Sequence, residues 1–124
     1  MKLLDTWAWI EYFKGTQKGK EVKQIIEQED VCTSMISLAE IAKWVTQNSL
    51  DLAQAVQQVK QNTVLLELDE SLLIESGKFY NILRAKRSKI GMIDVIIYIT
   101  AIRYALSLIT GDKDLIGLPN VEVL

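Results

Sequence analysis

Short runs of apolar and β-branched residues recur along the chain, and the longer segments between them repeat apolar residues every three or four positions. The short runs predict five β-strands. These runs lie at residues 2–5, 31–34, 63–68, 106–110 and 121–124. The spacing in the longer segments predicts amphipathic helices, because it places apolar side chains on one helical face. These segments are residues 6–14, 18–29, 36–48, 51–61, 69–87 and 92–105.

The residues between these segments support the predicted ends. Gly15 closes the first helical segment, and Asp69 begins the segment 69–87, which ends in cations as the helix dipole favours. Residues 88–91 are expected to form a loop, and residues 111–117 a turn with a short helix. Strands that alternate with helices predict a parallel sheet covered on both faces, which is the α/β class with three α/β/α layers.

The length of 124 residues suits one hydrophobic core, so we expect a single domain over residues 1–124. The most apolar stretch begins at Met92, but Asp94 and Arg103 lie inside it and oppose a membrane span. The N-terminus shows no signal peptide, because an acid follows within a few residues of its one lysine. We therefore expect a cytoplasmic protein without membrane contacts.

The residue types that the chain lacks restrict its chemistry. There is no histidine, which removes Ser-His-Asp and Cys-His catalysis and His-ligated zinc. The one cysteine, Cys32, excludes an internal disulfide and is expected to fill the core. A net charge of −2 argues against nucleic-acid binding through bulk positive charge alone, although bound cations could supply that charge. Catalysis would need carboxylates, lysines, hydroxyls or metals that prefer oxygen.

Four acids follow predicted strands or begin predicted helices. Asp5 ends the first strand, and Asp112 follows the fourth. Glu40 and Asp94 lie near the starts of the segments 36–48 and 92–105. Such junctions lie close together at the carboxyl edge of a parallel sheet. Each acid also has a structural interpretation. Asp5 could cap the next helix, and Glu40 could form a capping box with Ser37. The helix dipole could stabilise Asp94, and Asp112 could be a turn or cap residue.

Taken together, these acids favour a metal site. Carboxylates at one edge repel one another, and apolar neighbours such as Leu4, Ile93 and Ile109 make their ionisation costly without a cation. Oxygen ligands without histidine or thiol groups point to Mg²⁺ or Mn²⁺. Such ions polarise a phosphoryl oxygen and lower the pKa of a bound water. The chemistry indicated is phosphodiester hydrolysis.

The segments that hold the acids resemble the PIN-domain ribonucleases, and the chain's size is similar to that of the VapC-type toxins of toxin–antitoxin pairs. The matching segments are "LLDTWAWIEYF", "SLAEIAKW", "GMIDVIIYITA" and "LITGDKDL". The resemblance implies a three-layer PIN-like fold with a central parallel sheet, and a Mg²⁺- or Mn²⁺-dependent endoribonuclease. It further implies an antitoxin partner, which lies over the first helices and inserts a basic side chain near the acids, and a homodimer.

Carried over by position, the resemblance assigns roles to individual residues. The acidic quartet of catalytic residues and metal ligands would be Asp5, Glu40, Asp94 and Asp112. Asp114 would replace or assist Asp112 as a ligand, and Thr6 and Thr110 would orient the site through their hydroxyls. The chain departs from many relatives at Trp7, where they have a small polar residue. That departure concerns substrate or partner contacts near the first helix.

Cations near the acids suggest an RNA-binding surface. Five of them are candidate contacts to the phosphate backbone: Lys14, Arg84, Lys86, Arg87 and Lys89. A solvated helix end with favourable dipole interactions explains these cations equally well.

Aromatic residues cluster in the first helical segment. Trp7, Trp9, Tyr12 and Phe13 could stack on unpaired bases, but their helical spacing favours core packing, an antitoxin groove or a dimer face. Trp44 is expected to serve packing.

Other functions fit parts of the pattern. A phospho-receiver module would use Asp69 as its acceptor, but it would lack the second acid beside Asp5 and leave Glu40 and Asp94 unused. A catalytically silent interaction domain would use the acids only as helix caps. A PIN nuclease of RNA processing would share the site without being a toxin.

Overall fold

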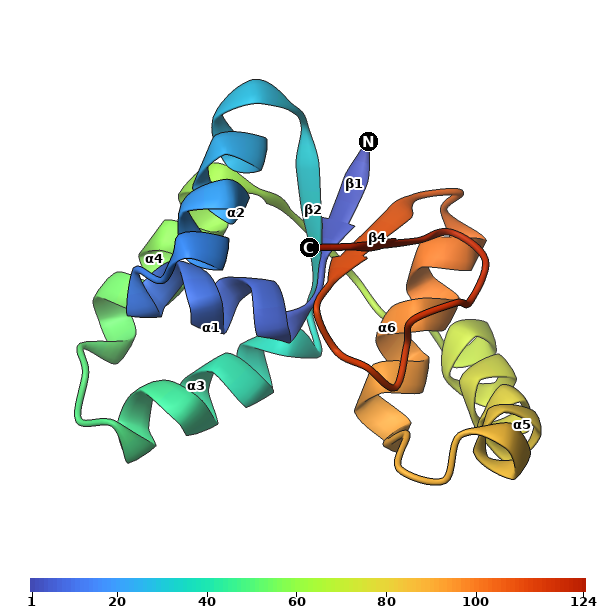
Figure 1. Ribbon diagram of the computed structural model, residues 1–124. Coiled ribbons are helices and arrows are strands. Elements are labelled where there is room, and N and C mark those ends of the chain that lie inside the picture. The colour runs from blue at the N-terminus through green and yellow to red at the C-terminus, as the bar shows by residue number, and fades with distance from the viewer.

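The computed structural model describes residues 1–124 and contains five strands and six helices (Figure 1). The strands are β1 (Lys2–Leu4), β2 (Val31–Ser34), β3 (Val64–Leu66), β4 (Ser107–Thr110) and β5 (Val121–Val123). The helices are α1 (Thr6–Lys14), α2 (Gln17–Gln28), α3 (Ser37–Gln47), α4 (Leu52–Asn62), α5 (Glu70–Lys86) and α6 (Met92–Arg103). All the strands and the six long helices predicted from the sequence are present.

The strands form one parallel sheet in the order β3-β2-β1-β4-β5. The chain moves outward from β1 through β2 to β3, and then returns to the other side of β1 to form β4 and β5 (Figure 1). The strand order therefore reverses between β1 and β4. In open α/β sheets the crevice beyond the strand ends at such a reversal is the usual ligand site.

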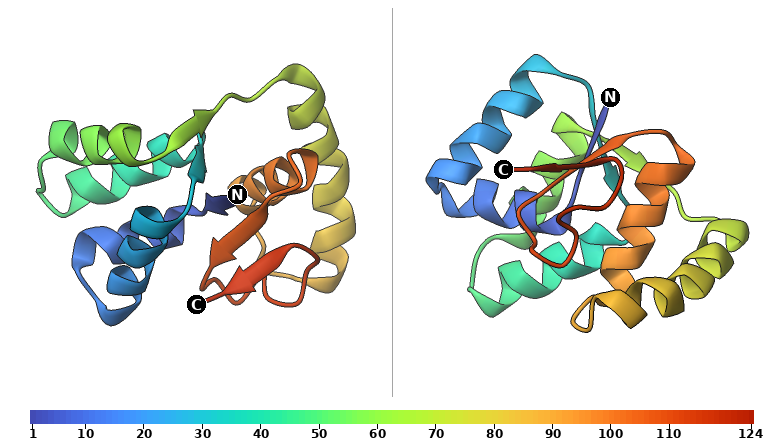
Figure 2. Two further views of the ribbon diagram at one scale, coloured as in Figure 1. Left: turned by 90° about the horizontal axis from the view of Figure 1, so that it is seen from above. Right: turned by 45° about the vertical axis from the view of Figure 1, so that its right-hand side comes forward.

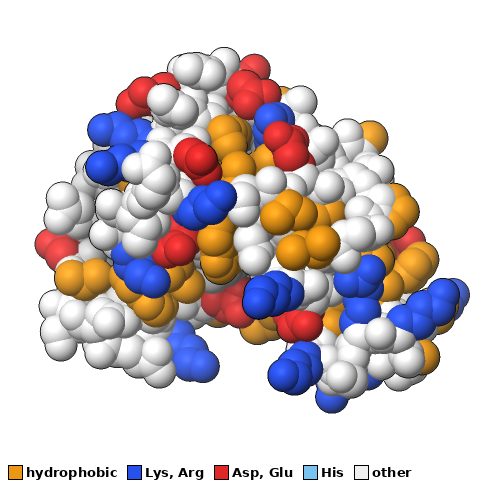
Figure 3. Space-filling model, in the orientation of Figure 1, with side chains coloured by type: hydrophobic (Ala, Val, Ile, Leu, Met, Phe, Trp, Pro, Cys, Tyr) orange, Lys and Arg blue, Asp and Glu red, His pale blue; other side chains and the backbone are white.

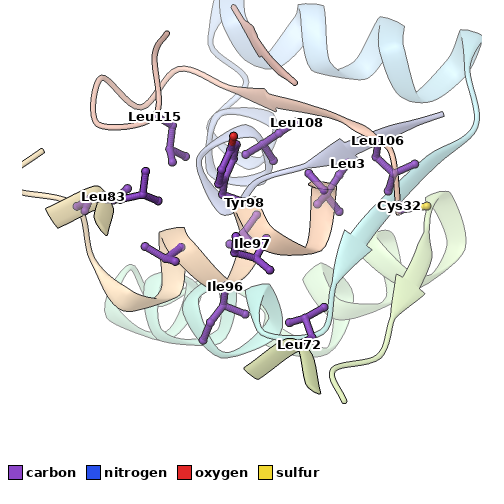
Figure 4. Packing of buried hydrophobic residues seen from close by; sticks show 14 residues of the cluster. Leu3, Cys32, Leu72, Leu83, Ile96, Ile97, Tyr98, Leu106, Leu108 and Leu115 are labelled. Atoms are coloured by element: carbon purple, nitrogen blue, oxygen red, sulfur yellow. The ribbon is translucent and has the colours of Figure 1, made fainter. Parts of the chain in front are cut away.

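Helices cover both faces of the sheet, with α1 to α4 on one side and α5 and α6 on the other (Figure 2). Successive residues of a strand point to opposite faces. In β1, Leu3 belongs to the core under α5 and α6, whereas Leu4 belongs to the core under α1 to α4. The neighbours Cys32 and Leu108 pair with Leu3 and join it in the first core (Figure 4). The predicted three-layer α/β/α fold and the packing of Cys32 are thus confirmed.

The aromatic residues of α1 belong largely to the core. Trp9 is completely buried, and its Nε1 donates a hydrogen bond of 2.9 Å to Thr33 Oγ1. The Trp9 ring meets Tyr12 edge-on and stacks on Phe13, which in turn stacks on Trp44. Burial excludes Trp9 from contacts with bases or a partner.

One predicted element is absent. Residues 111–117 contain no helix, and residues 113–117 form turns instead. The Asp112 carboxylate accepts a hydrogen bond from the Asp114 backbone N–H, which favours a turn at this point. Gly117 follows with φ of 90°, a conformation that ends helical geometry.

None of the helices combines the length and the apolar character that a membrane span needs. This includes α6, although seven consecutive residues from Val95 to Ala101 are buried in it. The apolar character of α6 therefore serves the core against α5 and the sheet.

Candidate functional site

Asp5 lies at the end of β1, beside the reversal of strand order. Its side chain caps α1 by accepting a hydrogen bond from the Trp7 backbone N–H, and its Oδ2 accepts one from the Thr110 hydroxyl. The residue is 4% exposed. Burial raises the pKa of this carboxyl to about 7, with smaller contributions from the charges of Asp94 and Asp112, although the two hydrogen bonds oppose the rise. A buried acid of this kind is costly to ionise without a neighbouring cation.

Thr110, at the end of β4, connects two of the predicted site acids. Its hydroxyl donates to Asp5 and accepts a hydrogen bond of 3.0 Å from the Asp112 backbone N–H. Thr110 is completely buried, so its hydroxyl has no access to water. The Asp112 Oδ1 in turn accepts a hydrogen bond of 2.9 Å from Asp114 N. The structure thus links Asp5, Thr110, Asp112 and Asp114 in one chain of hydrogen bonds.

Glu40 lies on α3 and faces Thr6 at the start of α1. The Thr6 Oγ1 contacts Glu40 Oε1 at 2.5 Å and Ser37 Oγ at 3.1 Å. The capping-box interpretation of Ser37 and Glu40 is wrong, because α3 begins at Ser37 and its cap position, Ile36, has no side-chain hydrogen bond. Ser37, which is completely buried, is a neighbour of the site that the sequence analysis did not identify. Its spacing from Glu40 was the one available signal, and it fitted a cap equally well.

Asp94 lies in the first turn of α6, where its Oδ2 accepts a hydrogen bond of 3.2 Å from the Gly91 backbone N–H. This position at the start of a helix agrees with the structural interpretation of Asp94 as an acid stabilised by the helix dipole. Burial raises the pKa of its carboxyl to about 6, and the charges of Asp112, Glu40 and Asp114 add to the rise. Asp94 thus lies within the electrostatic reach of three other acids from two separate segments of the chain.

The five acids are Asp5, Glu40, Asp94, Asp112 and Asp114. None of them takes part in an ion pair with a lysine or arginine. Figure 3 shows acidic side chains in a hollow at the lower edge of the molecule, with Lys and Arg side chains on either side. No three of these carboxylates lie close enough together to form a preorganised metal site. Their oxygen-only donor set, without a competing cation, nevertheless fits Mg²⁺ or Mn²⁺.

The predicted RNA-binding cations differ in their surroundings. Lys86 and Lys89 are exposed near the turn between α5 and α6. Lys14 is half-exposed and lies 3.4 Å from Glu11. Arg84 donates to Tyr80 Oη at 2.6 Å and to the Ile90 carbonyl at 3.2 Å. Arg87 donates to the carbonyls of Asp114 and Ile116, so this guanidinium faces the protein.

Trp7, the departure noted in the sequence, packs over the backbone at Gly111. A Cβ atom at Gly111 would clash with Trp7 Cζ2, so a larger residue there would displace the indole or the loop. Trp7 is partly buried. The indole therefore covers the backbone immediately before Asp112.

A separate groove of about 500 Å³ lies between the α1–α2 pair and the α3–α4 pair. Both apolar and charged groups line it, including Tyr12, Phe13, Lys20, Lys23 and Asp51. The groove includes none of the five acids. It is therefore a second surface feature, distinct from the acidic hollow.

Comparison with known proteins identifies the family of the chain. Residues 2–120 match the family model of the PIN domain. No curated protein sequence matches the chain significantly. Among solved structures, a toxin–antitoxin complex from Klebsiella pneumoniae is similar over 98% of this chain and 96% of that chain, with 26% identity and a TM-score of 0.75.

Two more distant structures share the fold. A VapBC complex from Rickettsia felis, bound to a promoter DNA fragment, has 17% identity and a TM-score of 0.74 over 99% of this chain and 96% of that chain. A sarcin–ricin loop cleaving toxin from Mycobacterium tuberculosis has 12% identity and a TM-score of 0.71 over 86% and 85%. The family match covers almost the whole sequence, and the parallel sheet flanked by helices agrees with the fold that the resemblance implies. The chain therefore belongs to the PIN domain family.

Proposed function

We propose that this chain is a metal-dependent endoribonuclease and the toxin of a VapBC-type toxin–antitoxin pair. Residues 1–124 would act as a single cytoplasmic PIN domain. The observation that carries the proposal is the gathering of five carboxylates from separate segments, without a paired cation, beside the reversal between β1 and β4. Membership of the PIN domain family supports it.

The residues that would hold the metal are Asp5, Glu40, Asp94 and Asp112, with Asp114 as an alternative or accessory ligand. When bound, Mg²⁺ or Mn²⁺ would polarise a phosphoryl oxygen and lower the pKa of a water molecule. Thr110 and Thr6 would hold the Asp5 and Glu40 carboxylates in fixed orientations. Burial raises the pKa of Asp5 and of Asp94, so both carboxyls bind a proton at higher pH than an ordinary aspartate when no cation is present.

The proposed substrate is RNA. The sarcin–ricin loop cleaving toxin with the same fold supports RNA as the substrate class. The exposed Lys86 and Lys89, with Lys14, Arg84 and Arg87 as further sequence candidates, would attract the phosphate backbone. Binding through such cations weakens as salt rises, since it depends on counterion release.

The proposed partner is an antitoxin chain seated over the first helices. The toxin–antitoxin complex from Klebsiella pneumoniae supports this partner, and the groove lined by Tyr12, Phe13 and Lys20 offers an apolar surface with charged edges on α1, α2, α3 and α4. A homodimer is also part of the proposal. Large apolar side chains exposed on α5, such as Ile74 and Ile82, supply a surface that an interface would bury.

The structure gives the phospho-receiver alternative no support. Asp69, the acceptor of the phospho-receiver alternative, caps α5 and lies 3.5 Å from Arg103, so it is already paired. A silent interaction domain would explain why Asp5 and Asp94 cap helices. It would not explain why the acids gather where their ionisation is opposed by burial and by one another.

The direct test is cleavage of labelled single-stranded and structured RNA by the purified, partner-free chain. The proposal predicts cleavage with Mn²⁺ or Mg²⁺ and none with EDTA. Cleavage that persists in EDTA would contradict metal dependence. A folded chain that binds no Mn²⁺ by calorimetry and cleaves none of the RNAs would favour the interaction domain.

A further inference from the structure

The segment between β4 and β5 carries two of the candidate ligands without the support of a helix or strand. This acidic loop is defined here as residues 111–118 and includes Asp112 and Asp114. We propose that Arg87, at the end of α5, is a positioning residue that holds the acidic loop in place for metal binding. The inference rests on the proposed nuclease function, because it gives the loop's acids a role toward the metal.

The contacts of Arg87 are directed at the backbone of the acidic loop. Its Nη1 lies 3.1 Å from the Asp114 carbonyl oxygen and 2.8 Å from the Ile116 carbonyl oxygen. These carbonyls stand on either side of Leu115, which is completely buried in the core beside Tyr98 (Figure 4). One guanidinium thus binds the loop backbone on both sides of Leu115, the only completely buried residue of the loop.

Arg87 projects from a backbone that is itself fixed. Its N–H donates a hydrogen bond of 2.8 Å to the Leu83 carbonyl and so closes α5. Its carbonyl accepts one of 3.2 Å from Ile90 N, and Ile90 is completely buried. The side chain is half-buried rather than exposed. Both ends of the connection, α5 and Leu115, are therefore anchored in the same core.

The acidic loop carries two carboxylates and belongs to no helix or strand, so contacts from other segments must hold it in position. Arg87 forms no ion pair with either carboxylate, and its contacts to the loop are made with carbonyls. The guanidinium therefore holds the loop without competing with a cation for the carboxylate oxygens.

At the other end of the loop, Trp7 covers Gly111. Near the carboxyl end, the Arg87 Nη2 would lie 3.5 Å from a Cβ at Gly117, where φ is 90°. The loop is thus held at its start by an indole and near its end by a guanidinium. Arg87 thereby acquires a role different from the RNA contact suggested by its charge and position in the sequence.

The test compares Arg87→Met with Lys78→Met. Each variant loses one positive charge on or next to α5, but Lys78 is exposed and has no hydrogen bond to the loop. Arg87→Lys keeps the charge and lacks the planar donor fork. Two properties are measured without RNA: the Mn²⁺ affinity by calorimetry, and the amide hydrogen exchange of residues 111–118. Wild type and Asp94→Asn are measured in parallel.

We expect Arg87→Met to bind Mn²⁺ at least about tenfold more weakly than wild type, as for other residues that orient metal ligands. Its loop amides should exchange faster, and Lys78→Met should match wild type in both measurements. Arg87→Lys should recover only part of the loss, since a role that needs charge alone would be rescued fully.

The outcomes separate this inference from the proposed function. If wild type binds Mn²⁺ through Asp94, and Arg87→Met equals Lys78→Met in affinity and exchange, the role of Arg87 is overturned and the nuclease proposal stands. If wild type binds no Mn²⁺, the proposed function fails and this inference fails with it. Weaker RNA binding by Arg87→Met with unchanged Mn²⁺ affinity and loop exchange would return Arg87 to the role of an RNA contact.

Discussion

The Thr110 hydroxyl donates a hydrogen bond to Asp5 Oδ2, although the two residues are 105 positions apart in the chain. The contact exists because β1 and β4 are neighbours in the parallel sheet and end at the same edge. The same hydroxyl accepts a hydrogen bond from Asp112 N. Thr110 therefore fixes one candidate ligand directly and positions the backbone of a second.

Replacing Thr110 with valine preserves its shape and removes its hydroxyl. Asp5 loses a hydrogen bond that lowers its pKa, so that pKa should rise further, and Asp112 N loses its acceptor. We expect a loss of about 1–3 kcal/mol in the free energy of unfolding, measured by urea denaturation. The acid limb of the pH–rate profile should move to higher pH. Thr110→Ser, which keeps the hydroxyl, is the control, and equal pH profiles for both variants would contradict the assignment.

The raised pKa values predict how stability depends on pH in the metal-free protein. The folded state holds Asp5 with a pKa of about 7 and Asp94 with one of about 6, both above the ordinary value of 3.8. Between about pH 4 and pH 7 the folded state therefore binds more protons than the unfolded state. The free energy of unfolding should fall as the pH rises through this range. Melting curves without metal should show this decrease, and Asp94→Asn should reduce it.

Mn²⁺ should reverse that dependence, because the metal binds ionised carboxylates. The stabilisation by Mn²⁺ should therefore grow between pH 5 and pH 8. A melting temperature that rises with Mn²⁺ equally at both pH values would argue against ligation by Asp5 and Asp94.

The packing of Trp7 on Gly111 predicts a coupled pair of mutations. In Gly111→Ala the new Cβ would lie 2.3 Å from the indole, so the ring or the loop must move. We expect a cost of about 1–3 kcal/mol in wild type. The cost should be smaller in a Trp7→Ala background, where space is available. A double-mutant cycle from urea denaturation measures this coupling, and additive effects would contradict the contact.

The burial of Trp9 predicts a loss of stability without a loss of RNA binding. Trp9→Phe removes the hydrogen bond from Nε1 to Thr33 Oγ1 and leaves a buried polar group with one partner fewer. The expected cost is about 1–3 kcal/mol in unfolding free energy. RNA affinity at a temperature where both proteins are folded should equal that of wild type. Weaker RNA binding by the folded variant would place Trp9 at the substrate surface after all.

Most strands and helices could be predicted from the sequence, because the hydrophobic pattern that forms each of them lies within a short segment. Leu3 and Leu4 lie on opposite faces of the sheet, and both faces are covered, so β1 reads as a continuous apolar run. The parallel order then places the carboxyl ends of β1 and β4 side by side, which is why Asp5 and Asp112 could be associated from sequence. The short helix expected in 111–117 is absent because the Asp112 carboxylate accepts a hydrogen bond from Asp114 N, and this local bond competes with helix formation.

The details of the site depended on contacts between distant segments. The spacing of Ser37 and Glu40 suited a cap, but Thr6 lies opposite and takes Glu40 as its partner. Arg87 could be recognised as a cation near Asp94, whereas its carbonyl partners lie 27 and 29 positions further along the chain. Local sequence patterns do not record such pairings, so the orientation of the acids had to come from the structure.

Whether these acids hold a catalytic metal can be tested by comparing Asp94→Asn with Asp69→Asn. Both residues accept a backbone hydrogen bond at a helix start and carry the same charge, but Asp69 is exposed and pairs with Arg103. Asparagine can keep either cap, so both variants should fold. The measurement is Mn²⁺-dependent cleavage of labelled RNA, with Mn²⁺ titrated by calorimetry on the same preparations.

We expect Asp94→Asn to lose Mn²⁺ binding and to cleave RNA at least about 100-fold more slowly, the scale expected when one transition-state-stabilising group is lost. Asp69→Asn should retain both properties. Without metal, Asp94→Asn should melt at a higher temperature than wild type at pH 8, because a carboxylate that other charges repel is gone. Cleavage and Mn²⁺ binding by Asp94→Asn at the level of Asp69→Asn would show that Asp94 does not hold a catalytic metal.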